Sequence, residues 1–215
     1  MAILTFKNAI ASSRSSSQDH FPSGDATMPE KSAPEPSAKS LLLSIARRSI
    51  QSSLMGERFD PVINDDELLA PQGAFVTLTQ KGRLRGCIGA VESRDPLYKT
   101  VAAMAVQAAL DDPRFPPLTL EELPKTHIEI SLLSPLQRIS KIQAIKMGTH
   151  GVMLHISGRR GLYLPQVGTQ TGWNVETFLS NICSEKMGLP GDAWKRPEAE
   201  IYTFTVESIE EARPI

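Results

Sequence analysis

The chain has 215 residues, of which 40% are hydrophobic, and its formal net charge at pH 7 is −1. This length supports one sizeable core or two small lobes that share one. The near-neutral charge provides no global basic field, so a nucleic-acid partner is not expected. No apolar run approaches the roughly 20 residues of a membrane-spanning helix, so no membrane association is expected. The two cysteines, Cys87 and Cys183, suit a reducing compartment rather than a disulfide framework.

Residues 1–38 are rich in serine, proline and charged residues, which predicts a disordered tail. The first residues are mildly apolar and lack acids, a pattern that resembles a weak transit peptide. Because this segment is short and is interrupted by Lys7 and Asn8, an untargeted tail is favoured. Apolar residues then recur at helical spacing, which predicts a helix from Ser40 to Met55 with Arg47 on its solvated side.

A β-hairpin is predicted next. Residues 74–80 are apolar and β-branched, Lys81-Gly82 provides a turn, and the chain returns over residues 83–91. Because strand side chains alternate between faces, Arg85 and Cys87 should share one face. A nearby guanidinium favours the charged form of a thiol, so Arg85 would push Cys87 towards thiolate.

Two glycines, Gly86 and Gly89, flank Cys87 in this hairpin. Because they lack side chains, a ligand or a second backbone could approach the thiol closely. The alternative is structural: glycines inside a strand often mark a bulge, and a bulge at Gly86 would turn Cys87 into the core. The residues alone leave both interpretations open.

A second helix is predicted from Asp95-Pro96 to residue 111, because an acidic cap and a proline both signal a helix start. The stretch Asp112-Pro113-Arg114-Phe115-Pro116-Pro117-Leu118 that follows is a stiff loop fixed by three prolines. Arg114 on this frame suits an anion-binding residue, or a structural arginine that holds backbone carbonyls or an acid. Thr119 and Glu122 have the spacing of a capping box.

The remaining elements are predicted from alternation and helical spacing. They are a half-buried strand at 127–133, a second hairpin formed by strands at 151–156 and 162–167, a helix from Asn174 to Met187, and a final strand at 201–206. Cys183 lies on the core face of that last helix and is expected to be inert.

His127, His150 and His155 are the possible bases for a cysteine nucleophile. His150 precedes a strand, where its side chain can project into a cleft, although a lone histidine is more often structural. No cysteine–histidine pair has the spacing of metal ligands, so no metal is expected. The phosphate-binding, dinucleotide-binding and Gly-x-Ser-x-Gly motifs are absent, and no cofactor is expected.

Two long motifs, Leu84-Arg85-Gly86-Cys87-Ile88-Gly89 and the 112–118 loop, together with Leu164-Pro165-Gln166-Val167 and His150-Gly151, resemble the AMMECR-type domain family, also called AmmeMemoRadiSam system protein A. The resemblance places this domain at 39–207, followed by a C-terminal tail at 208–215. It implies an α+β fold of two unequal lobes with mostly antiparallel sheets flanked by helices. Whether each lobe is contiguous in sequence stays open.

The resemblance also implies a cytoplasmic protein that is often encoded beside a Memo-like protein and a radical S-adenosylmethionine (SAM) enzyme. It implies no assigned reaction, and the Arg-Gly-Cys-Ile-Gly stretch is the suspected functional site.

Two hypotheses follow, and whether the protein is an enzyme stays open between them. In the first, Cys87 is a nucleophile or covalent anchor, and the arginines bind a small anionic ligand. The candidate site then consists of the catalytic residues Cys87, Arg85 and His150 and the ligand-binding residues Gly86, Gly89, Arg114 and Gln166. In the second, the protein is a non-catalytic adaptor that docks a partner through the hairpin and the 112–118 loop.

Overall fold

The computed structural model describes residues 37–212, which form two four-stranded antiparallel sheets with flanking helices. This is the α+β architecture that the resemblance implies. The first sheet has the strand order β2-β1-β3-β8 and the second the order β4-β7-β5-β6. The strands are β1 Ala74–Gln80, β2 Arg83–Ala90, β3 His127–Leu133, β4 Gln137–Ile139, β5 Gly151–Ile156, β6 Arg159–Tyr163, β7 Glu200–Phe204 and β8 Val206–Glu210.

The other regular elements are α-helices and shorter helical turns, which precede the first strand or connect later ones. The α-helices are α1 Ala38–Met55, α2 Asp66–Leu69, α3 Leu97–Leu110, α4 Pro165–Thr171 and α5 Val175–Asn181. Three 3₁₀ turns lie at Leu123–Lys125, Ile142–Ala144 and Ala193–Lys195, and a π-helical turn at Ile182–Lys186 continues α5. None of the helices in the described part of the chain is long and apolar enough to cross a membrane.

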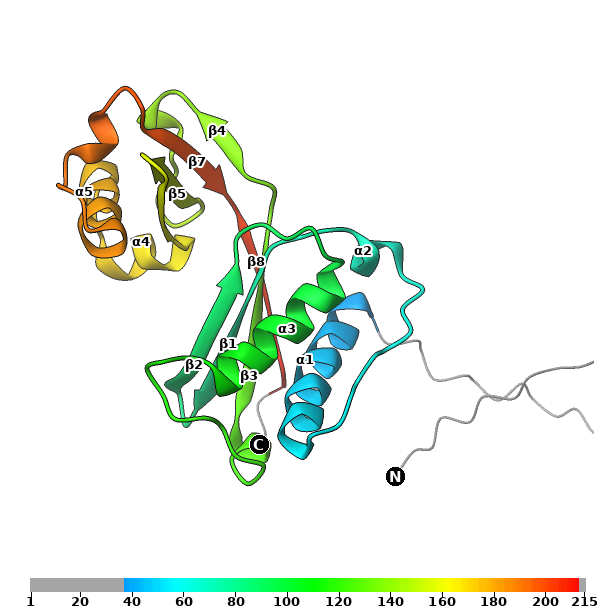
Figure 1. Ribbon diagram of the computed structural model, residues 1–215. Helices are drawn as coiled ribbons and strands as arrows, with labels where there is room; N and C mark the ends of the chain where they lie inside the picture. Colours follow the sequence, from blue (N-terminus) through cyan, green and yellow to red (C-terminus); the bar gives the residue numbers. More distant parts are fainter. Residues whose placement is uncertain (1–36, 213–215) are drawn as a thin grey trace, which may run out of the picture. The chain divides into compact units, whose positions relative to one another are not determined.

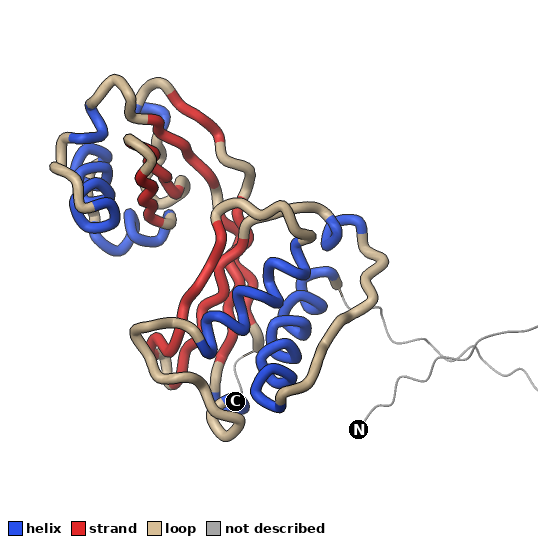
Figure 2. Tube along the Cα trace, in the orientation of Figure 1, coloured by secondary structure: helices blue, strands red, loops and turns tan. Residues whose placement is uncertain are grey.

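Helices α1 and α3 lie side by side against one face of the first sheet (Figures 1 and 2). Strand alternation supplies the apolar surface that they cover, because Ala74, Val76 and Leu78 of β1 are all fully buried. The predicted first hairpin and the alternation predicted for residues 127–133 are confirmed by β1, β2 and β3. The opposite face of this sheet, here called the open face, carries Thr77 and Glu129 as cross-strand neighbours.

Helix α1 begins at Ala38, two residues before the predicted start at Ser40, and it is capped at both ends. The Ser37 side chain accepts a hydrogen bond from the Ser40 backbone N–H, and Gly56 ends the helix with φ of 70°. The expectation that Arg47 lies on the solvated side is wrong. Its guanidinium donates to the Leu123 carbonyl at 2.9 Å and to Glu211 at 2.6 Å, and so ties α1 to the end of the chain.

The second sheet is covered by α4, α5 and the π-helical turn, which share the core that surrounds Phe178. The strand predicted at 162–167 is wrong in its bounds, because β6 begins at Arg159 and ends at Tyr163, and Pro165 opens α4. The helix predicted from Asn174 to Met187 is present in outline, with its last turn widened to π geometry at 182–186.

The chain crosses between the sheets twice. It passes from β3 to β4 and later returns from β7 to β8 through the single residue Thr205. The two crossings are hydrogen-bonded to each other, because the Ser134 N–H donates to the Thr205 carbonyl at 3.0 Å and the Thr205 N–H donates to Ser134 Oγ at 2.9 Å. The first sheet therefore takes strands from both ends of the domain. Strand β8 extends to Glu210, into the residues predicted to be a tail.

The predicted disorder of residues 1–38 and the transit-peptide comparison concern residues that lie outside the described part of the chain, apart from the last two, which cap and open α1.

Gly86 faces α3, and a Cβ atom at this position would lie 2.0 Å from the Ala108 carbonyl oxygen. We expect Gly86→Ala to lower the free energy of unfolding by about 1–3 kcal/mol, because a packed backbone cannot move away from the added carbon. Gly191→Ala is the matched control, since its Cβ would meet nothing closer than 3.5 Å. Urea denaturation of both variants tests this, and equal stability of the two would contradict the packing role.

Candidate functional site

A β-bulge interrupts the hairpin immediately before Cys87. Leu78 pairs with Gly86 and Thr79 pairs with Leu84, which leaves Arg85 without a partner on β1. One extra residue shifts the alternation, so Arg85 and Cys87 do not share the face predicted for them. The bulge predicted as an alternative is present, but it redirects Arg85 rather than turning Cys87 into the core.

Arg85 forms an ion pair on the helical side of the sheet. Its guanidinium donates to both carboxylate oxygens of Glu122 at 3.1 Å and to the Pro117 carbonyl at 3.3 Å. Glu122 is held in turn by the predicted capping box, in which it accepts from the Thr119 N–H at 3.0 Å. The Arg85 side chain is 11% exposed, and its Nη1 is buried without a hydrogen-bond partner among the described residues.

This ion pair replaces the thiol partner that was predicted for Arg85. Hydrogen bonds from Arg85 lower the pKa of the Glu122 carboxyl. The guanidinium is therefore engaged by a carboxylate, and its expected role of tuning the thiol is not supported by its contacts.

The outer edge of β2 is clamped by Asp112 and Arg114. The Cys87 N–H donates to Asp112 Oδ2 at 2.8 Å, and Arg114 Nη2 donates to the Cys87 carbonyl at 3.2 Å. Both groups point away from β1, at an edge where unpaired backbone groups would otherwise be exposed. The two long sequence motifs are thus joined directly, one on each side of this contact.

Asp112 is the centre of this clamp. Its side chain is only 2% exposed, and Arg114 donates to it from Nε at 2.9 Å and from Nη2 at 2.7 Å. These hydrogen bonds hold the pKa of the Asp112 carboxyl far below its usual range, and the N–H groups of Cys87 and Arg114 act in the same direction. The pKa of Arg114 is raised, first by the hydrogen bond to Asp112 and to a smaller extent by Cys87. Of the two alternatives for Arg114, its contacts match the structural one.

The Cys87 side chain lies on the open face of the sheet. Its Sγ is 3.4 Å from Thr77 Oγ1, and these two residues are directly paired across β1 and β2. The residue is partly exposed, whereas Cys183 is fully buried and the pKa of its thiol is raised by that burial. The expectation that Cys183 is a core thiol is confirmed.

A cleft of about 740 Å³ separates the open face of the first sheet from the second sheet. Phe75, Thr77 and Glu129 line one wall, and the opposite wall is built mainly from apolar residues of β5, β6 and α4. The lining residues of the second wall include Met153, Arg160, Leu162, Tyr163, Leu164, Gln166 and Lys186. Thr77 therefore connects the cleft to the Cys87 thiol.

The other predicted site residues are divided between this cleft and structural positions. Gln166 lines the cleft, and its Oε1 is buried without a hydrogen-bond partner among the described residues. A Cβ atom on Gly89 would lie 2.2 Å from the Phe75 ring, so this glycine makes room for a side chain of the cleft wall. Gly86 contacts α3 instead, on the opposite face of the sheet.

His150 is placed in a turn of the second lobe. Its Nδ1 accepts a hydrogen bond from the Lys146 backbone N–H at 3.3 Å, which closes the turn before β5. Among the described residues, no hydrogen bond or ion pair joins His150 to Cys87, so the base role predicted for it has no geometric support. His127, by contrast, lies on the first sheet, where its Nε2 is 3.0 Å from Glu210.

Sequence reasoning missed the charged residues of the second wall. Lys186 reaches the cleft because the π-helical turn carries it over the Tyr163 ring, with Nζ 5.2 Å from the ring centroid. Burial raises the pKa of Tyr163, and so does its hydrogen bond to Glu185. A π-helical turn has no simple sequence signature, although such turns are frequent at functional sites.

The fold and this cleft define a class of protein: an α+β domain in which an open cleft lies between two antiparallel sheets, beside a cysteine-bearing edge strand. Residues 43–209 match the family model for AMMECR1, a range that includes both long motifs and every predicted site residue. The chain therefore belongs to the AMMECR1 family.

Proteins that are similar in sequence and in structure support this family assignment. The chain is 39% identical over 178 residues to a protein of Methanothermobacter thermautotrophicus, with 79% of this chain and 92% of the relative covered. It is 38% identical over 185 residues to a protein of Pyrococcus furiosus, with coverage of 80% and 88%. The crystal structure of an uncharacterized protein from Pyrococcus horikoshii is similar with a TM-score of 0.74 and 37% identity, covering 81% of this chain and 91% of that chain.

We expect the Asp112 clamp to make stability depend on pH. A carboxyl whose folded pKa lies below its unfolded value of about 4 stabilises the protein above that pH and loses this contribution as the pH falls. Asp112→Asn should therefore lower the free energy of unfolding by about 2 kcal/mol at pH 7. The difference from wild type should shrink as the pH falls through about 4 and below.

Urea denaturation of wild type and variant across that pH range measures the difference. Asp111→Asn, at the exposed neighbouring position, is the control. A gap between wild type and Asp112→Asn that stays constant down to low pH would contradict a carboxylate at the centre of the clamp.

Proposed function

We propose that this protein binds a small, mainly apolar ligand with an anionic group in the cleft, and that Cys87 serves there as a nucleophile or covalent anchor. The observation that carries this proposal is the contact between the Cys87 thiol and the hydroxyl of Thr77, a residue of the cleft wall. The cleft volume of about 740 Å³ falls in the range of small-molecule sites.

The polar groups of the cleft support this class of ligand. The walls are mostly apolar, and a few polar groups among them can fix the orientation of a bound molecule. Gln166 Oε1 is a buried acceptor that lacks a partner in the described residues, so a donor group on the ligand would satisfy it. Lys186 and Arg160 supply positive charge on the second wall, whereas the carboxylates that line the cleft, of Glu92 and Glu129, belong to the first wall.

In this proposal Lys186, rather than Arg85 or Arg114, binds the anionic group of the ligand. Arg85 is paired with Glu122 and Arg114 with Asp112, whereas the Lys186 ammonium lies over an aromatic ring in the cleft. The positive charge of Arg160 is partly balanced by the Glu92 carboxylate, which lies 3.8 Å from its guanidinium. Lys186 is therefore the preferred contact for an anionic group.

The family resemblance adds the setting for this activity. We propose that the protein acts in the cytoplasm together with a Memo-like protein and a radical SAM enzyme, as one component of a system that modifies a small molecule or a protein. The cleft would then hold the substrate or intermediate of that system, with the thiol as its attachment point.

Disulfide exchange with a matched pair of fragments tests the site. Both fragments carry a phenyl group on a short disulfide-linked chain, and one ends in a carboxylate and the other in a primary amide. In the presence of 2-mercaptoethanol, we expect intact-mass spectrometry to show capture on Cys87 with a preference of about tenfold for the carboxylate. Lys186→Met, which keeps the aliphatic stem, should remove the preference, and Lys81→Gln in the exposed hairpin turn should not.

The adaptor function is the second candidate, and a specific surface favours it. The hairpin and the 112–118 loop are joined by the contacts of Arg85, Asp112 and Arg114, and Leu84 beside them is 44% exposed. If Cys87 captures neither fragment and a purified Memo-like protein forms a stable complex, the ligand-site proposal fails and the adaptor function replaces it. That complex should be broken by Leu84→Ser and not by Val62→Ser, a control at another exposed apolar position.

A further inference from the structure

A second cavity, of about 570 Å³, lies among the helices of the first lobe. It is formed by α1, α3 and the segment 57–61 that follows α1, and it is here called the helix groove. Helices α1 and α3 cover the face of the first sheet opposite the open face (Figure 1), and the helix groove shares no lining residue with the cleft. Nothing in the proposed cleft function uses it.

A buried serine hydroxyl lines the helix groove and has no hydrogen-bond partner in the described part of the chain. Ser49 of α1 is 7% exposed, lines the groove, and its Oγ makes no hydrogen bond to any described residue. A serine inside a helix usually donates to the carbonyl one turn before it, or else faces water. Buried polar groups normally have a hydrogen-bond partner, and alanine at this position would stabilise the helix more than serine does. A bound molecule would supply the partner that the described residues do not.

The charges around the helix groove have one predominant sign. Three carboxylates, of Glu57, Asp60 and Asp111, line it, against two cations: the Lys99 ammonium, which also lines it, and the Arg48 guanidinium, which lies over the Phe59 ring of its wall. A concave site with an excess of one sign concentrates small ions of the opposite sign. The alanines of α3 that also line the groove leave space for such a molecule.

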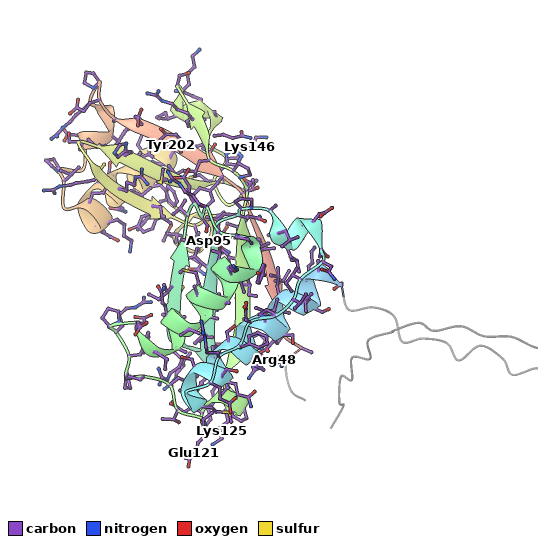
Figure 3. All side chains as sticks on the ribbon, turned by 45° about the vertical axis from the view of Figure 1, so that its right-hand side comes forward. Arg48, Asp95, Glu121, Lys125, Lys146 and Tyr202 are labelled. Carbon is purple, nitrogen blue, oxygen red and sulfur yellow. The ribbon has the colours of Figure 1, made fainter. Side chains whose placement is uncertain are left out.

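Two aromatic rings on the groove wall attract cations. The Arg48 guanidinium, on the α1 side chain labelled in Figure 3, lies 4.5 Å from the centroid of the Phe59 ring. The Lys99 ammonium lies 5.8 Å from the centroid of the Tyr98 ring. Each ring thus already attracts one cation of the protein itself. Both rings also offer apolar area to the body of a ligand.

We propose that the helix groove binds a small organic amine in its protonated form. The ammonium would be held by the Ser49 hydroxyl and by the carboxylates of Asp60 and Asp111. The apolar part of the amine would lie against Phe59 and Tyr98. This binding site is independent of the thiol and of the cleft.

Three phenyl-bearing probes that differ in charge test this proposal: 2-phenylethylammonium, 2-phenylethanol and 3-phenylpropionate. Titration into the ¹⁵N-labelled full chain should give saturable shifts with the ammonium at the amides of α1 and α3 that line the groove. We expect its affinity to exceed that of the alcohol by about tenfold or more and no binding of the carboxylate there. Equal affinity for the alcohol, absence of saturable shifts, or shifts confined to the cleft would overturn the proposal.

The Ser49 hydroxyl provides a sharper test, because its removal has opposite effects on stability and on binding. Ser49→Ala should raise the thermal midpoint of the ligand-free protein, since an unpaired buried hydroxyl is lost, and should weaken the ammonium complex several-fold. Ser184→Ala, a control on the helix of the other lobe whose hydroxyl donates to the Ser180 carbonyl, should not change affinity. Unchanged affinity in Ser49→Ala, with the shifts of a folded protein, would contradict the site.

Discussion

The buried carboxylate of Asp112 is the contact on which the arrangement around Cys87 depends. It accepts the Cys87 N–H and the fork of Arg114, and Arg114 in turn donates to the Cys87 carbonyl. Each interaction is charge-assisted, and together they close the outer edge of β2 with a proline-stiffened loop. Asp112 is almost completely buried and accepts four hydrogen bonds from Cys87 and Arg114, so removal of its charge would weaken all four. On its outer edge, β2 is therefore held by a loop, whereas its inner edge pairs with β1.

Local sequence pattern was sufficient to predict most of the first sheet. The alternation of Ile128 and Ile130, the turn at Lys81-Gly82 and the capping box at Thr119 are short-range signals, and the structure contains the corresponding elements. The final strand was predicted at 201–206, but β7 ends at Phe204 and a separate strand, β8, begins at Val206. The single residue between them, Thr205, carries the chain from one sheet to the other. No periodicity marks such a crossing.

The candidate site was less predictable, because one β-bulge changed which side chains meet. The alternation rule placed Arg85 beside Cys87, but the residue left unpaired at the bulge turns towards Glu122, 37 positions further along the chain. Next to the bulge, Gly86 approaches α3 closely, a tertiary contact that local pattern does not reveal. Sequence reasoning found Gln166 as a cleft residue from the family resemblance, yet the π-helical turn that brings Lys186 into the same cleft was not foreseen.

The two faces of the first sheet therefore have different chemistry. The open face carries Thr77 and Glu129 towards a cleft whose second wall is apolar with two cations, Arg160 and Lys186, and the Cys87 thiol lies beside Thr77 on the same face. The other face is covered by α1 and α3, whose own groove is lined by carboxylates and contains a serine hydroxyl with no hydrogen-bond partner among the described residues. This separation favours an anionic group near Lys186 and a cationic one near Ser49, so the two proposed sites would select opposite charges.

The most direct test of this arrangement is the pH profile of alkylation of Cys87 by iodoacetamide in Arg85→Gln. The rate is measured by mass spectrometry from about pH 6 to about pH 10, with the buried Cys183 as an internal control for unfolding. Because Arg85 is paired with Glu122, we expect the profile of Arg85→Gln to match those of wild type and of Arg83→Gln. A loss of about tenfold in rate at neutral pH in Arg85→Gln alone would contradict this, since it would show that Arg85 acts on the thiol.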